Sequence, residues 1–95
     1  MPVAHLIQFR TSTPDEIISQ LRGYSERELD RKAPKGFISS RILTATDGKS
    51  VAFYSEWDDA QTLEDTRDSA PWEACMDLSD VHADGRSETT FGIER

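Results

Sequence analysis

The sequence predicts an α+β protein with the element order β-α-β-β-α-α-β, a ferredoxin-like arrangement around a four-stranded antiparallel sheet. Three observations support this fold class. Residues with strand propensity recur in four stretches, at 3–10, 37–46, 49–57 and 87–94. A stretch with apolar residues at helical spacing separates the first two of them. Two helix-start signals precede the last one. No repeat or linker interrupts the chain, so residues 1–95 are predicted to form one domain.

The first strand and the first helix follow from local patterns. Along residues 3–10, one face carries Val3, His5, Ile7 and Phe9, and the other face also includes apolar residues. Residues 13–16 (TPDE) form a capping signal, in which the Thr13 hydroxyl is expected to accept from a backbone N–H. Apolar residues at helical spacing then predict a helix that ends near Lys32, before a proline and a glycine.

The central hairpin is predicted from two strands, 37–46 and 49–57, which are joined at an Asp-Gly turn. Beyond it, Asp58 with Gln61 predicts the start of a helix that ends near Arg67, and residues 69–71 (SAP) begin another. The strands carry bulky residues on both faces, whereas helices cover only one face of a ferredoxin-like sheet. We therefore predict a homodimer that packs sheet against sheet.

Composition disfavours two classes of partner. Eighteen acidic and eleven basic residues give a net charge of −7, and residues 56–84 contain ten acids and the single base Arg67. Such a surface disfavours nucleic acid and anionic membranes, and the acids are expected to form a solvated helix face. Without a membrane span or a signal-peptide pattern, a cytoplasmic protein is expected. Cys75 stands alone and is predicted to pack as a small hydrophobe, and no metal-ligand spacing is present.

Several motifs together resemble the antibiotic biosynthesis monooxygenase family. They are 34–37 (PKGF), 47–48 (DG), 54–57 (YSEW), 59–60 (DA) and 69–72 (SAPW). The resemblance implies a dimeric α+β barrel built from two ferredoxin-like subunits, with a small aromatic molecule bound between each sheet and its helices. It also implies a cofactor-independent monooxygenase that acts on a polycyclic phenol of the anthrone type, in polyketide metabolism. A haem-degrading branch of similar fold is disfavoured, because its tryptophan and histidine positions fall near Thr66 and Met76 here, and neither matches.

The resemblance also assigns site residues. Trp57 corresponds to the pocket tryptophan of the oxygenases, where its indole N–H would orient the substrate or stabilise an oxyanion. Phe53 stands where those enzymes carry asparagine, so this part of the pocket is predicted to be apolar. From the residues alone, His5 is a candidate general base, because histidine titrates near neutrality and this one lies beside apolar neighbours. Trp72 and Tyr24 are candidates to line the cavity, and Arg41 to bind an anionic ligand.

Alternatives remain open for each of these residues and for the function. Each aromatic residue, and His5, could simply pack in the core, and Arg41 could pair with Glu56 across a dimer. The protein could be a non-catalytic binding or accessory dimer, which the apolar Phe53 favours. It could also be a cyclase or isomerase, which would require His5 and an acidic residue to meet in the cavity.

Overall fold

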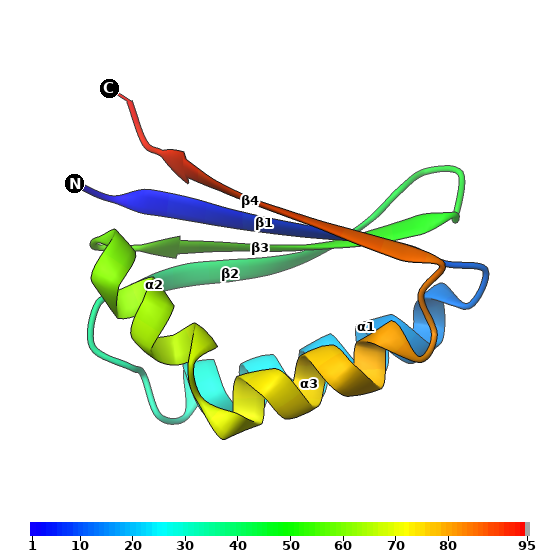
Figure 1. Cartoon of the computed structure of the whole chain (residues 1–95), viewed down its shortest axis with the longest axis horizontal. Coiled ribbons are helices and arrows are strands. Elements are labelled where there is room, and N and C mark those ends of the chain that lie inside the picture. The colour runs from blue at the N-terminus through cyan, green and yellow to red at the C-terminus, as the bar shows by residue number, and fades with distance from the viewer. Residues whose placement is uncertain (95) are drawn as a thin grey trace.

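The computed structural model describes residues 1–94 and contains one antiparallel sheet with the strand order β2-β3-β1-β4. All three α-helices lie on the same side of this sheet (Figure 1). The predicted α+β, ferredoxin-like fold class is confirmed. The elements are β1 (Val3–Arg10), α1 (Pro14–Tyr24), a π-helical segment η1 (Ser25–Asp30), β2 (Phe37–Thr44), β3 (Ser50–Trp57), α2 (Ala60–Arg67), α3 (Ala70–Asp80) and β4 (Gly85–Gly92).

The core lies between the sheet and the helices and is built on the two central strands. Register pairs His5 with Ser55 and Ile7 with Phe53, so alternate residues of β1 and β3 point toward the same side. Burial follows this alternation along β3, where every second residue is buried. The predicted grouping of Val3, His5, Ile7 and Phe9 on one face is confirmed, and all four side chains are buried.

The first helix differs from the prediction in its second half. The α-helical hydrogen-bond pattern ends at Tyr24, and residues Ser25–Asp30 continue as a π-helix rather than as regular α-helix. Tyr24 and Leu29 are both buried although they are five residues apart. A π-turn, with its i to i+5 hydrogen bonds, brings residues at this spacing onto one face. The wider turn thus keeps both side chains in the core.

Strand boundaries and helix caps also depart from prediction in detail. A bulge near Ile38 puts Phe37 on the helix side of the sheet, where its ring packs on Trp57. The last strand begins two residues early, at Gly85, and ends at Gly92. The side-chain cap of α2 is Asp59 rather than Asp58. Thr13 precedes α1 without a side-chain capping bond, because its hydroxyl lies 3.3 Å from that of Thr11.

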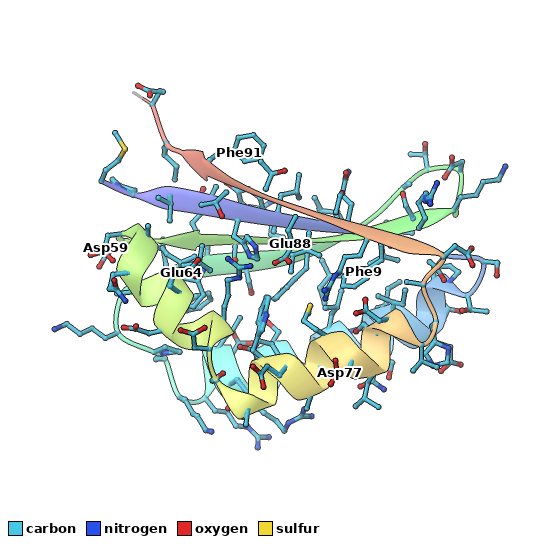
Figure 2. The ribbon with its side chains drawn as sticks, viewed as in Figure 1. Phe9, Asp59, Glu64, Asp77, Glu88 and Phe91 are labelled. Carbon is cyan, nitrogen blue, oxygen red and sulfur yellow. The ribbon has the colours of Figure 1, made fainter. Side chains whose placement is uncertain are left out.

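The other face of the sheet carries no helix. We call this side of the sheet the open face. Its apolar side chains include Leu6, Leu43, Tyr54 and Phe91. Figure 2 shows Phe91 on this side, whereas Phe9 and Glu88 point toward the helices. Leu43 and Phe91 keep about half of their surface exposed, at 47% and 50%. Within residues 1–94, no helix has both the length and the apolar character needed to span a bilayer.

Candidate functional site

Five of the six predicted site residues lie on the helix side of the sheet. His5, Phe53 and Trp57 project from β1 and β3, and Tyr24 and Trp72 approach them from α1 and α3. Arg41 pairs in register with Tyr54 on the open face. The sheet therefore separates Arg41 from the other five residues.

Four of these side chains form one aromatic cluster around Trp72. Its indole centroid lies 5.4 Å from that of Tyr24, 5.8 Å from the His5 ring and 6.3 Å from Phe53. Tyr24 also meets Phe53 edge-on at 6.5 Å. Burial raises the pKa of the Tyr24 phenol, so this hydroxyl is a poor proton donor and the cluster behaves as a packed apolar wall.

A buried histidine–carboxylate pair lies beside this wall. His5 is 1% exposed, and its Nε2 lies 3.0 Å from Oε1 of Glu88, on the neighbouring strand β4. A carboxylate only accepts hydrogen bonds, so Nε2 carries the hydrogen and donates a hydrogen bond to Glu88. Nδ1 then holds a free lone pair, and it is buried without a hydrogen-bond partner within residues 1–94. This tautomer leaves Nδ1 as a proton acceptor.

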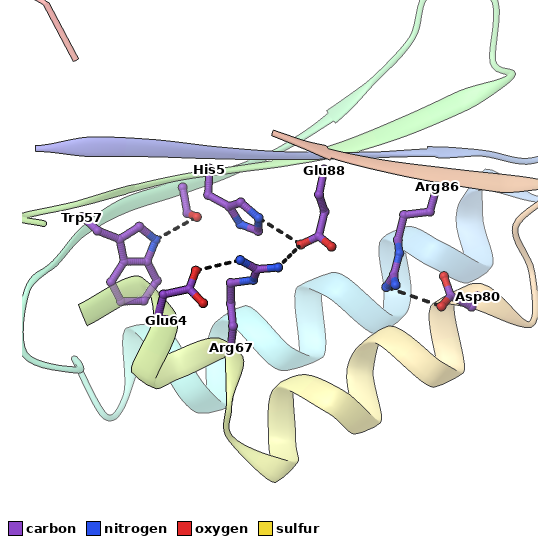
Figure 3. A network of polar contacts seen from close by, with 8 residues as sticks. His5, Trp57, Glu64, Arg67, Asp80, Arg86 and Glu88 are labelled. Carbon is purple, nitrogen blue, oxygen red and sulfur yellow. Dashed lines mark hydrogen bonds and ion pairs between the residues drawn. The ribbon is translucent and has the colours of Figure 1, made fainter. Parts of the chain in front are cut away.

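Arg67 fixes the carboxylate of this pair. Its guanidinium lies 3.3 Å from Oε1 of Glu88 and 2.8 Å from Oε1 of Glu64, so it bridges β4 and α2. Figure 3 shows Glu88 between His5 and Arg67, with all three side chains in the space between sheet and helices. The guanidinium pairs with the Glu88 carboxylate and holds it in position to orient the imidazole.

Sequence reasoning missed Glu88, Arg67 and Glu64 as parts of the site. The sequence carried a signal for two of them: Arg67 is the single base in the acidic segment 56–84, and Glu88 lies in the predicted strand 87–94. Alternation alone did not show that this position faces His5. The pairing of β4 with β1, which sets Glu88 opposite Ile7, decides it.

The electrostatics of His5 combine opposing effects. Burial lowers the pKa of His5 below its ordinary value, Glu88 raises it, and Arg67 lowers it, with burial the largest effect. The net pKa is lowered, so the ring is neutral at pH 7 and able to accept a proton.

Trp57 lies on the same side of the sheet, but its indole N–H already donates a hydrogen bond within the core. The indole Nε1 donates to Oγ of Ser55 at 2.9 Å, and the ring packs against Phe37 with 5.3 Å between centroids. The side chain is fully buried. An oxyanion role for Trp57 would require this N–H to exchange Ser55 for the substrate.

A cleft of about 410 Å³ opens between α2, α3 and β4, next to the histidine–carboxylate pair. Trp72 and Met76 form its apolar part, and Glu88 and Arg67 belong to its wall. Trp72 therefore lines the cleft and also neighbours the ring of His5, which is not itself a lining residue. Its other lining residues are Glu64, Asp68, Glu73, Asp77 and Arg86.

Metal binding and thiol chemistry find no support in the part of the chain that the structure describes. No group of three or more histidine, cysteine, aspartate or glutamate side chains there could hold a metal ion. Cys75 is buried, as predicted, and burial raises the pKa of its thiol, which makes it a weak nucleophile.

Solved structures with a similar fold cover nearly the whole chain. SnoaB, a cofactor-independent oxygenase from Streptomyces nogalater, superposes with a TM-score of 0.83 at 14% identity, over 99% of this chain and 94% of that chain. A structure described as an antibiotic biosynthesis monooxygenase gives 0.80 at 12% identity and covers both chains fully. The chain has the fold of the antibiotic biosynthesis monooxygenases. Rv0793 from Mycobacterium tuberculosis gives 0.78 at 18% identity, over 100% of this chain and 97% of that chain.

The likeness to antibiotic biosynthesis monooxygenases is thus confirmed at the level of fold. No protein-family model matches the chain, and no curated protein matches it. Identities of 12–18% carry no information about substrate. The chemistry must therefore be argued from the residues of this chain.

Proposed function

We propose that the protein is a cofactor-independent monooxygenase that oxidises a polycyclic phenol of the anthrone type, with His5 as general base. The observation that carries this proposal is the buried His5–Glu88 pair, in which Nδ1 has no hydrogen-bond partner within residues 1–94 and the imidazole neighbours Trp72, a residue that lines the cleft. The likeness in fold to a cofactor-independent oxygenase agrees with it.

The reaction needs little from the protein beyond proton transfer and an apolar surface. His5 Nδ1 accepts the proton of the phenol or enol, and Glu88 stabilises the imidazolium that forms. The resulting anion passes one electron to O₂, and the radical pair combines to form a C–O bond. Loss of water from the hydroperoxide yields the quinone, so anthrone and O₂ give anthraquinone and H₂O.

Access to His5 runs past Trp72. The imidazole is buried and its ring packs on the indole that lines the cleft. A planar substrate therefore reaches Nδ1 by displacing the Trp72 side chain and stacking in its place against Phe53 and Tyr24. An apolar, aromatic contact surface of this kind suits a polycyclic ring and excludes water from the anion.

The direct test is incubation of the purified protein with anthrone in air, following anthraquinone absorbance and oxygen uptake. We expect turnover above the buffer rate and incorporation of one ¹⁸O atom from labelled O₂ into the quinone. Quinone formation at the buffer rate with anthrone and with hydroxylated anthrones would contradict the proposal.

A second function, a cyclase or isomerase, is favoured by the same pair. Such an enzyme requires a base and an acid in one cavity, and His5 and Glu88 do meet. The two functions differ in their use of oxygen. Under nitrogen, an isomerase would still convert its substrate to product, whereas an oxygenase would release no product.

The pH dependence of either activity follows from the lowered pKa of His5. Only the neutral ring accepts a proton, so kcat/KM should rise with pH through a midpoint below 6.5 and then level off. Because Glu88 raises this pKa, Glu88→Gln should move the midpoint to still lower pH. A midpoint above 6.5, or one that Glu88→Gln moves upward, would contradict the assignment.

We also propose that the open face is the interface of a homodimer. It exposes apolar side chains on a helix-free sheet, and covering them would add to the small core of a 95-residue chain. Leu43→Glu should convert the dimer into a monomer in sedimentation velocity experiments. Leu78→Glu is the matched control, because this leucine is similarly exposed (52%) but lies on α3, and it should remain dimeric.

A further inference from the structure

The corner between α2 and α3, residues 67–72, contacts both members of the histidine–carboxylate pair. Arg67 is the last residue of α2, and its Nη2 lies 3.3 Å from Oε1 of Glu88. Trp72 lies in the first turn of α3, and its ring centroid is 5.8 Å from that of His5. Figure 3 shows Arg67 at the end of α2, directed toward Glu88. One short segment therefore closes the site at two points.

Few contacts attach this corner to the sheet. Trp72 is its only buried residue. The Ser69 hydroxyl donates to the backbone oxygen of Thr66 at 2.6 Å and accepts from the backbone N–H of Trp72 at 3.4 Å, so these bonds stay within the two helices and the corner. Within residues 1–94, the ion pair of Arg67 with Glu88 is the one polar contact that joins the corner to the sheet. One ion pair and one aromatic ring thus hold the corner in place.

Open space borders the corner on two sides. Toward β4 lies the cleft of about 410 Å³, to whose wall Arg67, Asp68 and Trp72 belong. Toward η1 lies a groove of about 430 Å³, which Ser69 and Pro71 line together with part of η1 and the loop after it. A segment between two hollows can shift without displacing a closely packed core, and segments with few buried contacts open most readily.

We propose that the α2–α3 corner is a gate over His5, which the ion pair of Arg67 with Glu88 keeps closed. This inference rests on the proposed function, since it supplies the movement by which Trp72 leaves His5 for the substrate. Opening breaks the ion pair and carries the Trp72 side chain away from the imidazole. The hydrogen bond between His5 and Glu88 remains, so the base stays oriented while the site is open.

The ion pair is suited to this role because it is only partly buried. The side chains of Arg67 and Glu88 keep 30% and 27% of their surface exposed. Pairs of this kind contribute a small free energy and weaken as the ionic strength rises. Loss of the pair should therefore raise the population of the open state by a small, measurable factor, and salt should do the same.

The test measures how fast His5 reacts with diethyl pyrocarbonate, which acylates a neutral imidazole nitrogen that solvent can reach. At about pH 8 the ring is neutral, because the pKa of His5 is lowered, so the rate reports access to the ring. Mass spectrometry separates His5 from the partly exposed His82, which serves as the internal reference.

At an ionic strength of about 0.02 M, we expect Arg67→Gln to raise the acylation rate of His5 at least about threefold. Raising the ionic strength to about 0.5 M should raise the rate in the parent protein toward that of the variant and leave the variant unchanged. Arg67→Lys retains the positive charge, so its rate should lie between those of the parent and Arg67→Gln.

Two control variants separate this ion pair from a general loss of charge. Arg86→Gln removes an ion pair of similar length and exposure, 3.4 Å and 31%, at the far end of α3. Glu64→Gln removes the other partner of Arg67 and leaves the contact with the sheet in place. Both should keep the acylation rate of His5 within about 1.5-fold of the parent. Circular dichroism melting verifies that the variants are folded.

The outcomes distinguish this inference from the proposed oxidation, because acylation requires neither phenol nor oxygen. An unchanged rate in Arg67→Gln, an equal rise in Arg86→Gln, or a parent rate that does not change with salt would overturn the gate. The salt response of the parent needs no substitution, so it tests the gate even if a variant does not fold. A gate that opens in Arg67→Gln, without oxidation of any phenol, would contradict the oxygenase proposal and support the gate.

Discussion

His5→Gln is expected to lower kcat/KM for anthrone oxidation by about 10²- to 10⁴-fold, which is the usual contribution of a positioned general base. The glutamine amide can still donate to Glu88, so the contact between β1 and β4 is preserved while the basic nitrogen is lost. Steady-state oxygen uptake gives the rate, and circular dichroism gives the fold. Activity within threefold of the parent protein would exclude His5 as the base.

Glu88→Gln is the informative companion to this variant. It keeps an oxygen that accepts from Nε2 of His5 but removes the charge that stabilises the imidazolium. We expect a smaller loss in kcat/KM, of about 10- to 100-fold, together with the downward shift of the acid limb described above. A core packing role for His5 would predict altered stability in these variants but no change in pH profile.

Trp57→Ala is expected to reduce the free energy of unfolding by about 3–5 kcal/mol, the range found for removing a large buried aromatic side chain. Trp57 is 1% exposed and packs against Phe37, so its removal leaves a cavity at the end of β3. For a domain of this size the loss corresponds to a melting temperature lowered by more than about 12 °C. Urea unfolding and thermal melting measure both quantities.

The control for that experiment is Leu78→Ala, which shortens an exposed side chain of α3 and should change the free energy of unfolding by less than about 0.5 kcal/mol.

Ser55→Ala tests the hydrogen bond that Trp57 forms in the same part of the core. It leaves the indole N–H of Trp57 buried without its acceptor, at a cost of about 1–3 kcal/mol. In the Trp57→Phe background the same serine substitution should cost much less, because no donor remains to be satisfied. Equal costs in both backgrounds would refute the bond.

Trp57→Phe also tests the catalytic role predicted from the family resemblance. The variant keeps an aromatic ring but removes the donor that an oxyanion would use. With the N–H bonded to Ser55, we expect kcat to stay within about threefold of the parent. A fall of 10-fold or more at unchanged fold would show instead that the indole N–H turns toward the substrate during the reaction.

Local patterns in the sequence predicted the fold class, because strand alternation and helix caps depend only on neighbouring residues. Alternation along residues 3–10 grouped His5 with Val3, Ile7 and Phe9 on one face, and Ser69 caps α3 where the SAP signal predicted. The π-helical turn after Tyr24 escaped prediction, because its i to i+5 spacing is stabilised by burial of Tyr24 and Leu29 in the tertiary core rather than by local propensity.

The candidate site also combines features that local sequence patterns predict with contacts that only the tertiary structure decides. The sequence by itself determined that Phe53 and Trp57 share one face of their strand and that His5 shares a face of its strand with Ile7, since side-chain direction in a strand follows from parity. The register of β1 with β3 then sets both faces on the same side of the sheet. Only the tertiary structure decided which acid meets His5, that Arg67 holds that acid, and that the indole of Trp57 is bonded to Ser55. These contacts join residues up to 83 positions apart, and they depend on the order of strands and on register, which no local pattern encodes.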